Sequence, residues 1–198
     1  MTYSGSLTRE QFMFQEMRIT ARLKREGFSD TEITSHVAEE NLFQYPTERE
    51  VHSKCRACLR RIDCLSEMPV ILGALAEGAI MEAKQACLIA MMCQNRLVAD
   101  FMVEVIGSKY RNLDMTITRK DMNVFFQQLA QREETVAVWT ENTVSKLKSV
   151  LRNCLKEAEY ISDIRSETLL PVMISDEFAD ELKRNGYRGF LPAFNVLD

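Results

Sequence analysis

The fold is decided by the segment EENLFQYPTEREVHSKCRACLRR, residues 39–61. Its aromatic connection ends at Pro46, and Thr47 followed by Glu50 is the pattern of a capping box, so a helix is expected to begin there. Apolar residues then recur at steps of three and four, which predicts an amphipathic helix with one buried stripe. A short helix is expected just before, over residues 30–38. This order of helix, turn and basic helix is the one that helix-turn-helix proteins present to a DNA groove.

The side of this predicted helix away from the apolar stripe is basic. On that side we expect contacts with DNA from Arg49, Ser53, Lys54, Arg56, Arg60 and Arg61. Arginine suits such contacts because its planar guanidinium can bond two acceptors at once, whereas lysine acts as a point charge. A solvated charged surface has the same pattern, so the charges alone leave both interpretations open.

The composition is that of a folded, helical protein. Hydrophobic residues make up 46% of the 198 residues and charged residues 27%, which excludes a disordered chain. With only 7 glycines and 4 prolines, the sequence favours a mainly α fold. The net charge of -4 gives no general attraction to nucleic acid, so any such binding must come from local basic patches.

The sequence contains no pattern typical of catalysis or metal binding. His52, Cys55, Cys58 and Cys64 would lie on one helix over about three turns, so they cannot surround one zinc ion. Buried, reduced thiols of a cytoplasmic protein are expected instead. Glycine-rich phosphate-binding loops and Ser/His or Cys/His motifs are absent. We therefore expect no enzyme, no cofactor, no metal and no small-molecule substrate.

Neither a signal peptide nor a membrane span is expected. The opening MTYSGSLTREQF has no long apolar segment, and the most apolar region, residues 70–93, is interrupted by Glu77, Glu82 and Lys84.

Two domains are expected. The first is an N-terminal helical domain over residues 1–115, which contains the helix-turn-helix-like unit at about 29–66. The second covers residues 116–198 and begins with three helices, of which the last runs over about 141–159.

A short β-hairpin is expected after these three helices. Residues 160–164 and 168–174 are β-permissive runs separated by a polar turn. Three helices followed by a hairpin is the layout of a winged helix, in which the third helix and the wing approach DNA together. The basic residues expected to contact DNA in this domain are Arg119, Lys120, Lys146, Lys148 and Arg152.

Six segments resemble the BrxA family, small proteins encoded in bacterial BREX (bacteriophage exclusion) defence loci. They are MTYSGSLTREQFMFQE, VAEENLFQYPTERE, LAEGAIMEAKQACLIAMM, NRLVADFMVEVI, VAVWTENTVSKLKSVL and TLLPVMIS. The similarity runs nearly end to end, and the most distinctive parts are EENLFQ and the pattern from Trp139 to Leu147.

The resemblance implies a cytoplasmic, non-enzymatic, all-helical protein that binds DNA through helix-turn-helix-type elements within a multi-protein phage-defence system. It implies no agreed catalytic motif, so the candidate residues above come from charge and periodicity. The main hypothesis is a protein that binds double-stranded DNA and other BREX proteins. An RNA-binding factor similar to a helical antitermination factor, and a protein-interaction adaptor, are the alternatives.

Overall fold

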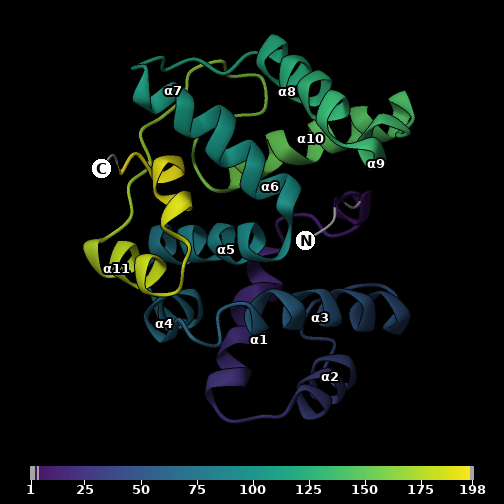
Figure 1. Cartoon of the computed structure of the whole chain (residues 1–198). Helices are drawn as coiled ribbons and strands as arrows, with labels where there is room; N and C mark the ends of the chain where they lie inside the picture. The colour runs from purple at the N-terminus through teal and green to yellow at the C-terminus, as the bar shows by residue number, and fades with distance from the viewer. Residues whose placement is uncertain (1–2, 4, 197–198) are drawn as a thin grey trace. The chain divides into compact units, whose positions relative to one another are not determined.

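A computed structural model describes residue 3 and residues 5–196, and over these residues the chain is all-α (Figure 1). Its α-helices, α1 to α11, are joined by loops, two 3-10 segments and one π-helical segment, and the described residues contain no β-strand. The prediction of a mainly α fold is therefore confirmed.

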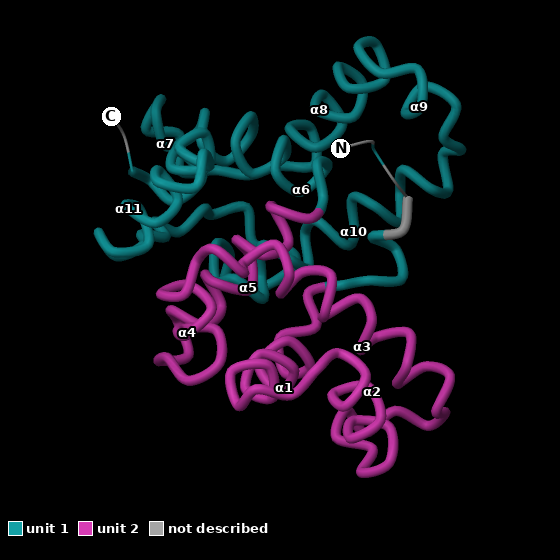
Figure 2. Tube along the Cα trace, turned by 60° about the horizontal axis from the view of Figure 1, so that its bottom comes forward, with its two compact units in different colours: residues 1–11, 95–198 teal, residues 12–94 magenta. Residues whose placement is uncertain are grey.

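The chain divides into two compact units, which Figure 2 colours separately. Unit 2 comprises residues 12–94, and unit 1 comprises residues 1–11 together with residues 95–198. The division into domains over residues 1–115 and 116–198 stays a prediction.

Unit 2 consists of five helices. They are α1 (Phe14–Arg25), α2 (Asp30–Glu39), α3 (Glu48–Asp63), α4 (Pro69–Glu77) and α5 (Ile80–Gln94).

Local sequence signals set the ends of the first three helices. Gly27 follows α1 with a φ of 94°, a left-handed conformation that glycine adopts without strain. Ser29 and Glu32 form a complete capping box at the start of α2. At the start of α3 the Thr47 hydroxyl accepts a hydrogen bond from the backbone N–H of Glu50 at 3.3 Å, which is one half of the predicted capping box.

The apolar stripe of α3 packs into a core that it shares with α1 and α2. The buried members of this core are Leu23, Ile33, Val37, Phe43, Val51, Cys55 and Leu59. Because the stripe takes one side of α3 inward, the opposite side of the helix is left to solvent.

Two arginines of α1 bond the end of α4. Arg22 Nε donates to the carbonyl oxygen of Ala76 at 2.8 Å, and Arg18 donates to that of Gly78 at 3.0 Å. The last carbonyls of a helix have no partner within the helix and carry the negative end of its dipole. The two guanidinium groups donate to these carbonyls and place positive charge at the negative end of the dipole, so they hold α1 and α4 together.

No single helix of the described residues is long and apolar enough to cross a membrane. Only the broken pair Ile80–Gln94 and Arg96–Arg111 meets the requirements of length and composition, when its two parts are taken together.

Unit 1 contains the remaining elements. They are η1 (Gly5–Thr8), α6 (Arg96–Asp100), η2 (Phe101–Gly107), α7 (Ser108–Arg111), α8 (Arg119–Arg132), α9 (Glu134–Ala137), α10 (Glu141–Glu157), α11 (Asp176–Arg184) and η3 (Arg188–Phe194).

The π-helical segment η2 joins α6 to α7 and packs closely on η3. A Cβ atom on Gly107 would lie 2.9 Å from Cβ of Pro192 and 3.1 Å from its backbone carbon, so no side chain fits at residue 107.

The β-hairpin predicted over residues 160–164 and 168–174 does not form. Within this described part of the chain, residues 160–165 form turns and bends, and an isolated antiparallel bridge joins Thr168 to Thr116. The winged-helix layout that depended on the hairpin is therefore not found here.

The second β-permissive run forms a backbone hydrogen bond to the first, from the N–H of Leu170 to the carbonyl oxygen of Tyr160 at 2.8 Å, and it is held further by a side chain of α7. The Tyr110 hydroxyl donates to the carbonyl oxygen of Leu170 at 2.6 Å and accepts from the backbone N–H of Val172 at 3.2 Å. The carbonyl of Leu170 and the N–H of Val172 are therefore bonded to α7 and not to a partner strand.

Arg152 of α10 binds the loops on either side. Its guanidinium donates to the backbone carbonyls of Ile164 at 2.7 Å, Ile117 at 3.2 Å and Ser166. Ile117 lies just before α8, and the other two lie in the turns after α10. One side chain therefore ties α10 to two segments that no sheet connects.

Lys109 of α7 is buried between two carboxylates. Its Nζ lies 2.9 Å from Oδ2 of Asp114 and 3.1 Å from Oδ1 of Asp121. Burial alone would lower the pKa of Lys109, but the hydrogen bonds to both carboxylates outweigh it and raise the pKa. Asp121 also forms the capping box with Thr118, so this ion pair fixes the start of α8.

The pKa values of the two carboxylates are lowered. The hydrogen bond from the Thr116 hydroxyl, followed by that from Lys109, lowers the pKa of Asp114 to about 2. Burial would raise the pKa of Asp121, but hydrogen bonds from Thr118 and Lys109 outweigh burial and lower it.

Replacing Arg152 by alanine should lower the free energy of unfolding by about 2–3 kcal/mol, because three backbone carbonyls lose a charged donor. Arg152→Lys should retain little of this free energy, since an ammonium cannot span the acceptors that a planar guanidinium reaches. Arg165→Ala, an exposed position in the same loop, is the matched control and should change stability by less than about 0.5 kcal/mol. Urea denaturation measures all three, and equal losses at the two positions would contradict a structural role for Arg152.

Acid should destabilise the fold through Asp114 and Asp121. Since their folded pKa values are depressed, their stabilising contribution is complete above the ordinary aspartate pKa of about 4 and is lost as the pH falls toward about 2. Asp114→Asn should therefore flatten the dependence of the unfolding free energy on pH in this window. Urea denaturation at pH 2 to 6 measures the slope, and an unchanged slope in the variant would refute the assignment.

Candidate nucleic-acid interface

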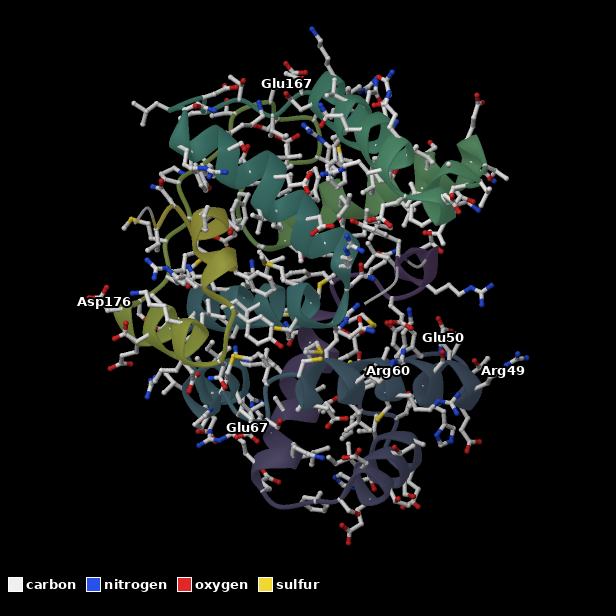
Figure 3. All side chains as sticks on the ribbon, in the orientation of Figure 1. Arg49, Glu50, Arg60, Glu67, Glu167 and Asp176 are labelled. Carbon is white, nitrogen blue, oxygen red and sulfur yellow. The ribbon has the colours of Figure 1, made fainter. Side chains whose placement is uncertain are left out.

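The outer side of α3 is exposed as predicted. Arg49, Ser53, Arg56 and Arg60 are exposed there, and Lys54 is half-buried with its Nζ 5.8 Å from the centre of the Tyr45 ring. We call Arg49, Ser53, Arg56 and Arg60 the α3 face. Figure 3 shows Arg49 at the outer end of α3, beside Glu50, and Arg60 further along the same helix.

Arg61 does not belong to the α3 face. Its side chain is only 1% exposed, and its guanidinium donates to the carbonyl oxygen of Phe12 at 3.2 Å. The residue lies next to Ile62 at the edge of the buried stripe, and the stripe is wide enough to take it inward. The structure therefore gives Arg61 a place in the core of unit 2 and corrects its expected place on the surface.

Carboxylates lie beside the arginines of the α3 face. A hollow of about 430 Å³ between α2 and α3 is lined by Asp30, Thr31, Thr34, Arg56, Leu59, Arg60 and Asp63. Its two aspartates reduce the positive potential that the two arginines create. This surface therefore attracts a polyanion less strongly than its arginines alone suggest.

A second hollow, of about 480 Å³, lies between α8 and α10 in unit 1. It is lined by Arg119, Met122, Asn123, Ser145, Lys148, Ser149, Arg152, Asn153 and Ile164. We call it the α8–α10 hollow. Three of the five cations predicted for this half of the chain line it, and no carboxylate is among the lining residues.

The capping box of α8 and the contacts of α10 position these three cations. Arg119 is the first residue of α8, directly after the cap at Thr118, and its side chain is exposed. Lys148 Nζ donates to Asn123 Oδ1 at 2.7 Å and lies 5.6 Å from the centre of the Phe126 ring. Arg152 is half-buried and is held by the backbone carbonyls described above.

The donors of the hollow are its cations and the amide of Asn123, whereas the Ser149 hydroxyl uses its proton on a backbone carbonyl and offers only an acceptor. The Oδ1 atom of Asn123 is occupied by Lys148, which leaves its amide N–H groups to face other partners. The Ser149 hydroxyl donates to the backbone carbonyl of Ser145 at 3.1 Å. Cations and amide donors without a carboxylate suit a ligand rich in anionic oxygen, such as a phosphate.

The remaining two predicted cations lie outside this hollow. Lys146 is exposed on α10, whereas Lys120 lines a different hollow of about 400 Å³ together with the carboxylates of Glu104, Asp114 and Asp121. Charge counting alone could not separate Lys120 from Arg119, because they are neighbours in the sequence.

The polar residues of the hollow were missed as candidates by charge alone, although a signal for them exists. Ser145, Ser149 and Asn153 recur at steps of four along α10, with Lys148 and Arg152 between them. This spacing places all five on one side of the helix. A stripe of polar and basic residues opposite the apolar stripe therefore marks a candidate site better than the cations do.

The cysteines are those of a packed interior. None of the six cysteines, which all lie among the described residues, forms a disulfide, and five of them are buried. Burial raises the pKa of the Cys58 thiol to about 12, so this thiol stays protonated at neutral pH. Among the described residues, no group of three or more His, Cys, Asp or Glu side chains could hold a metal ion.

Comparison with known proteins shows the family. The BrxA family profile matches residues 1–186. Proteins named BREX protein BrxA are similar over most of the chain: that of Bacillus cereus is 30% identical over 161 residues, covering 81% of this chain and 80% of its own. That of Paramagnetospirillum magneticum is 24% identical over 183 residues (92% and 91%), and that of Escherichia coli 22% over 187 residues (94% and 87%).

A solved crystal structure has the same fold. It is that of an uncharacterized protein from Magnetospirillum magneticum, with a TM-score of 0.82, 23% sequence identity and coverage of 100% of both chains. At this identity the likeness concerns the fold alone. The family match extends over nearly the whole sequence and includes both α3 and the α8–α10 hollow, and the chain belongs to the BrxA family.

Proposed function

We propose that this chain binds double-stranded DNA with little sequence preference, as a non-enzymatic accessory component of a BREX phage-defence system. The names of its relatives support the place in BREX. The observation that carries the proposal of DNA binding is the α8–α10 hollow, where three cations gather without a carboxylate. In this function the chain works in the cytoplasm beside other BREX proteins.

The physical basis is contact with the phosphate backbone. Each phosphate that a cation neutralises releases condensed counterions, so the affinity falls steeply as the salt concentration rises. Such contacts position a protein on the duplex without reading its sequence. Arg119 and Lys148 at the hollow and Lys146 on the exposed side of α10 are the residues that we assign to backbone contacts.

The α3 face is the second surface that this function would use. The order α2, turn and α3 matches the helix-turn-helix arrangement, and Arg49, Arg56 and Arg60 are exposed on its last helix. The nearby aspartates make this surface the weaker of the two for phosphate, so its contribution should be smaller.

Binding of a labelled duplex should depend strongly on salt. With three to four phosphates contacted, the logarithm of the affinity should fall with the logarithm of salt concentration with a slope of about -3 to -4. Fluorescence anisotropy over a salt series measures this slope for DNA and RNA duplexes of one length. A preference for RNA would favour an RNA-binding factor. If no nucleic acid binds at low salt but BREX proteins are retained after nuclease treatment, the chain is an adaptor.

Reversing charge at the hollow should weaken DNA binding more than reversing charge on α3. Arg119→Glu with Lys148→Glu should lower the affinity at least about tenfold and reduce the salt slope by about 2. Arg56→Glu with Arg60→Glu should have a smaller effect. Lys183→Glu with Arg184→Glu, exposed on α11, is the control with the same change of net charge and should leave the affinity within about twofold. Equal losses in all three variants would show that only net charge matters.

A further inference from the structure

The α8–α10 hollow is larger than a phosphate group requires. Its volume of about 480 Å³ lies in the range of about 300–1,000 Å³ that is usual for pockets that bind small organic molecules. A backbone phosphate of a duplex needs only the cations at its rim. The remaining volume and its lining therefore call for a separate explanation.

Part of the hollow is apolar. Ile164 lines the hollow from the turns after α10 and is 55% exposed, and Met122 lines it from α8 with only a small exposed area (3%). An apolar surface beside a cationic one is what a nucleobase and its phosphate require together, because a base removed from its stack is held against apolar or aromatic side chains.

Two side-chain amides also line the hollow. The amide of Asn153 offers both a donor and an acceptor, and the amide of Asn123 is turned so that it donates. Side-chain amides are well suited to base edges because they can form two hydrogen bonds at once.

We propose that the α8–α10 hollow binds one nucleoside monophosphate group, with its phosphate between Arg119 and Lys148 and its base against Met122 and Ile164. The group comes either from a free nucleotide or from a single unpaired nucleotide at the end of a DNA strand, and the two sources share this chemistry. The inference rests on the proposed function, because the same two cations contact the duplex backbone, and it adds a specific ligand to a surface that otherwise only attracts charge.

Arg152 has a positioning role in this site. Three of its five N–H groups are used by backbone carbonyls, so the guanidinium holds α10 and the turn that carries Ile164 in a fixed relation. The hollow keeps its width because of these bonds, and the two N–H groups that remain add donors to its wall.

Isothermal titration of the full chain with AMP, GMP, CMP and dTMP tests the proposal, with inorganic phosphate and the four nucleosides as separate probes. At least one monophosphate should bind ten times more tightly than inorganic phosphate and than its own nucleoside. For the second source, a duplex with one unpaired, 5′-phosphorylated terminal nucleotide should bind more tightly than a blunt duplex of the same length. Either preference supports the proposal, and the absence of both overturns it.

Ser149→Trp fills the hollow without a change of charge, and Thr135→Trp, exposed on α9, is its matched control. The first variant should lose monophosphate binding at least tenfold, and its loss of blunt-duplex binding should be smaller than that. The control should leave both unchanged. Thermal melting verifies that both variants fold. If Ser149→Trp does not fold, Asn153→Leu replaces it as a smaller change in the same hollow.

The two proposals fail separately in these measurements. If blunt duplexes bind, but no monophosphate exceeds inorganic phosphate and an unpaired terminal nucleotide adds no affinity, the nucleotide site is refuted and duplex binding stands. If a monophosphate binds and Ser149→Trp abolishes it, but no duplex binds at low salt, the nucleotide site stands and the proposed function is refuted.

Discussion

The guanidinium group of Arg152 is the contact on which the candidate site depends. It donates to the carbonyls of Ile117 and Ile164 as well as Ser166, and so joins the start of α8, the helix α10 and the turns that follow it. No β-ladder connects these segments, since the described residues of this region form only an isolated bridge. A side chain with five donors in one plane can replace part of a ladder, because each donor satisfies a carbonyl that would otherwise need a strand partner. The walls of the α8–α10 hollow are fixed in this way.

The cations of this chain therefore fall into two groups that sequence position does not separate. Arg18, Arg22 and Arg152 bond backbone carbonyls, and Lys109 is buried between two aspartates, so these side chains stabilise the fold. Arg119 and Lys146 make no ion pair among the residues that the structure describes, and they remain available to an external anion. A net charge of -4 is compatible with nucleic-acid binding only because the second group is gathered locally.

Short-range signals were reliable predictors of the fold. The helix start at Thr47 and the apolar stripe of α3 depend on residues within a few positions, and the structure confirms them. The hairpin could not be excluded from the sequence, because residues 168–174 are β-permissive and their competing partner, the Tyr110 hydroxyl, is distant in the chain. Arg61 and Arg152 show the same limit for the site. Whether an arginine faces solvent or a buried carbonyl depends on which distant backbone group arrives beside it, and charge patterns carry no such information.

Placing cations around one hollow without a carboxylate is unfavourable for the isolated fold, since like charges repel and none is neutralised. The chain reduces this cost with dipoles. Lys148 is held by the amide oxygen of Asn123 and the ring of Phe126, and Arg152 by backbone carbonyls. A carboxylate would stabilise the same side chains and would also cancel their field, whereas neutral dipoles orient them and leave their charge in place. Neutral dipoles around the cations thus stabilise the folded chain and leave the hollow attractive to phosphate. This arrangement explains why Asp114 and Asp121 pair with Lys109 while the cations of the hollow have no carboxylate among its lining residues.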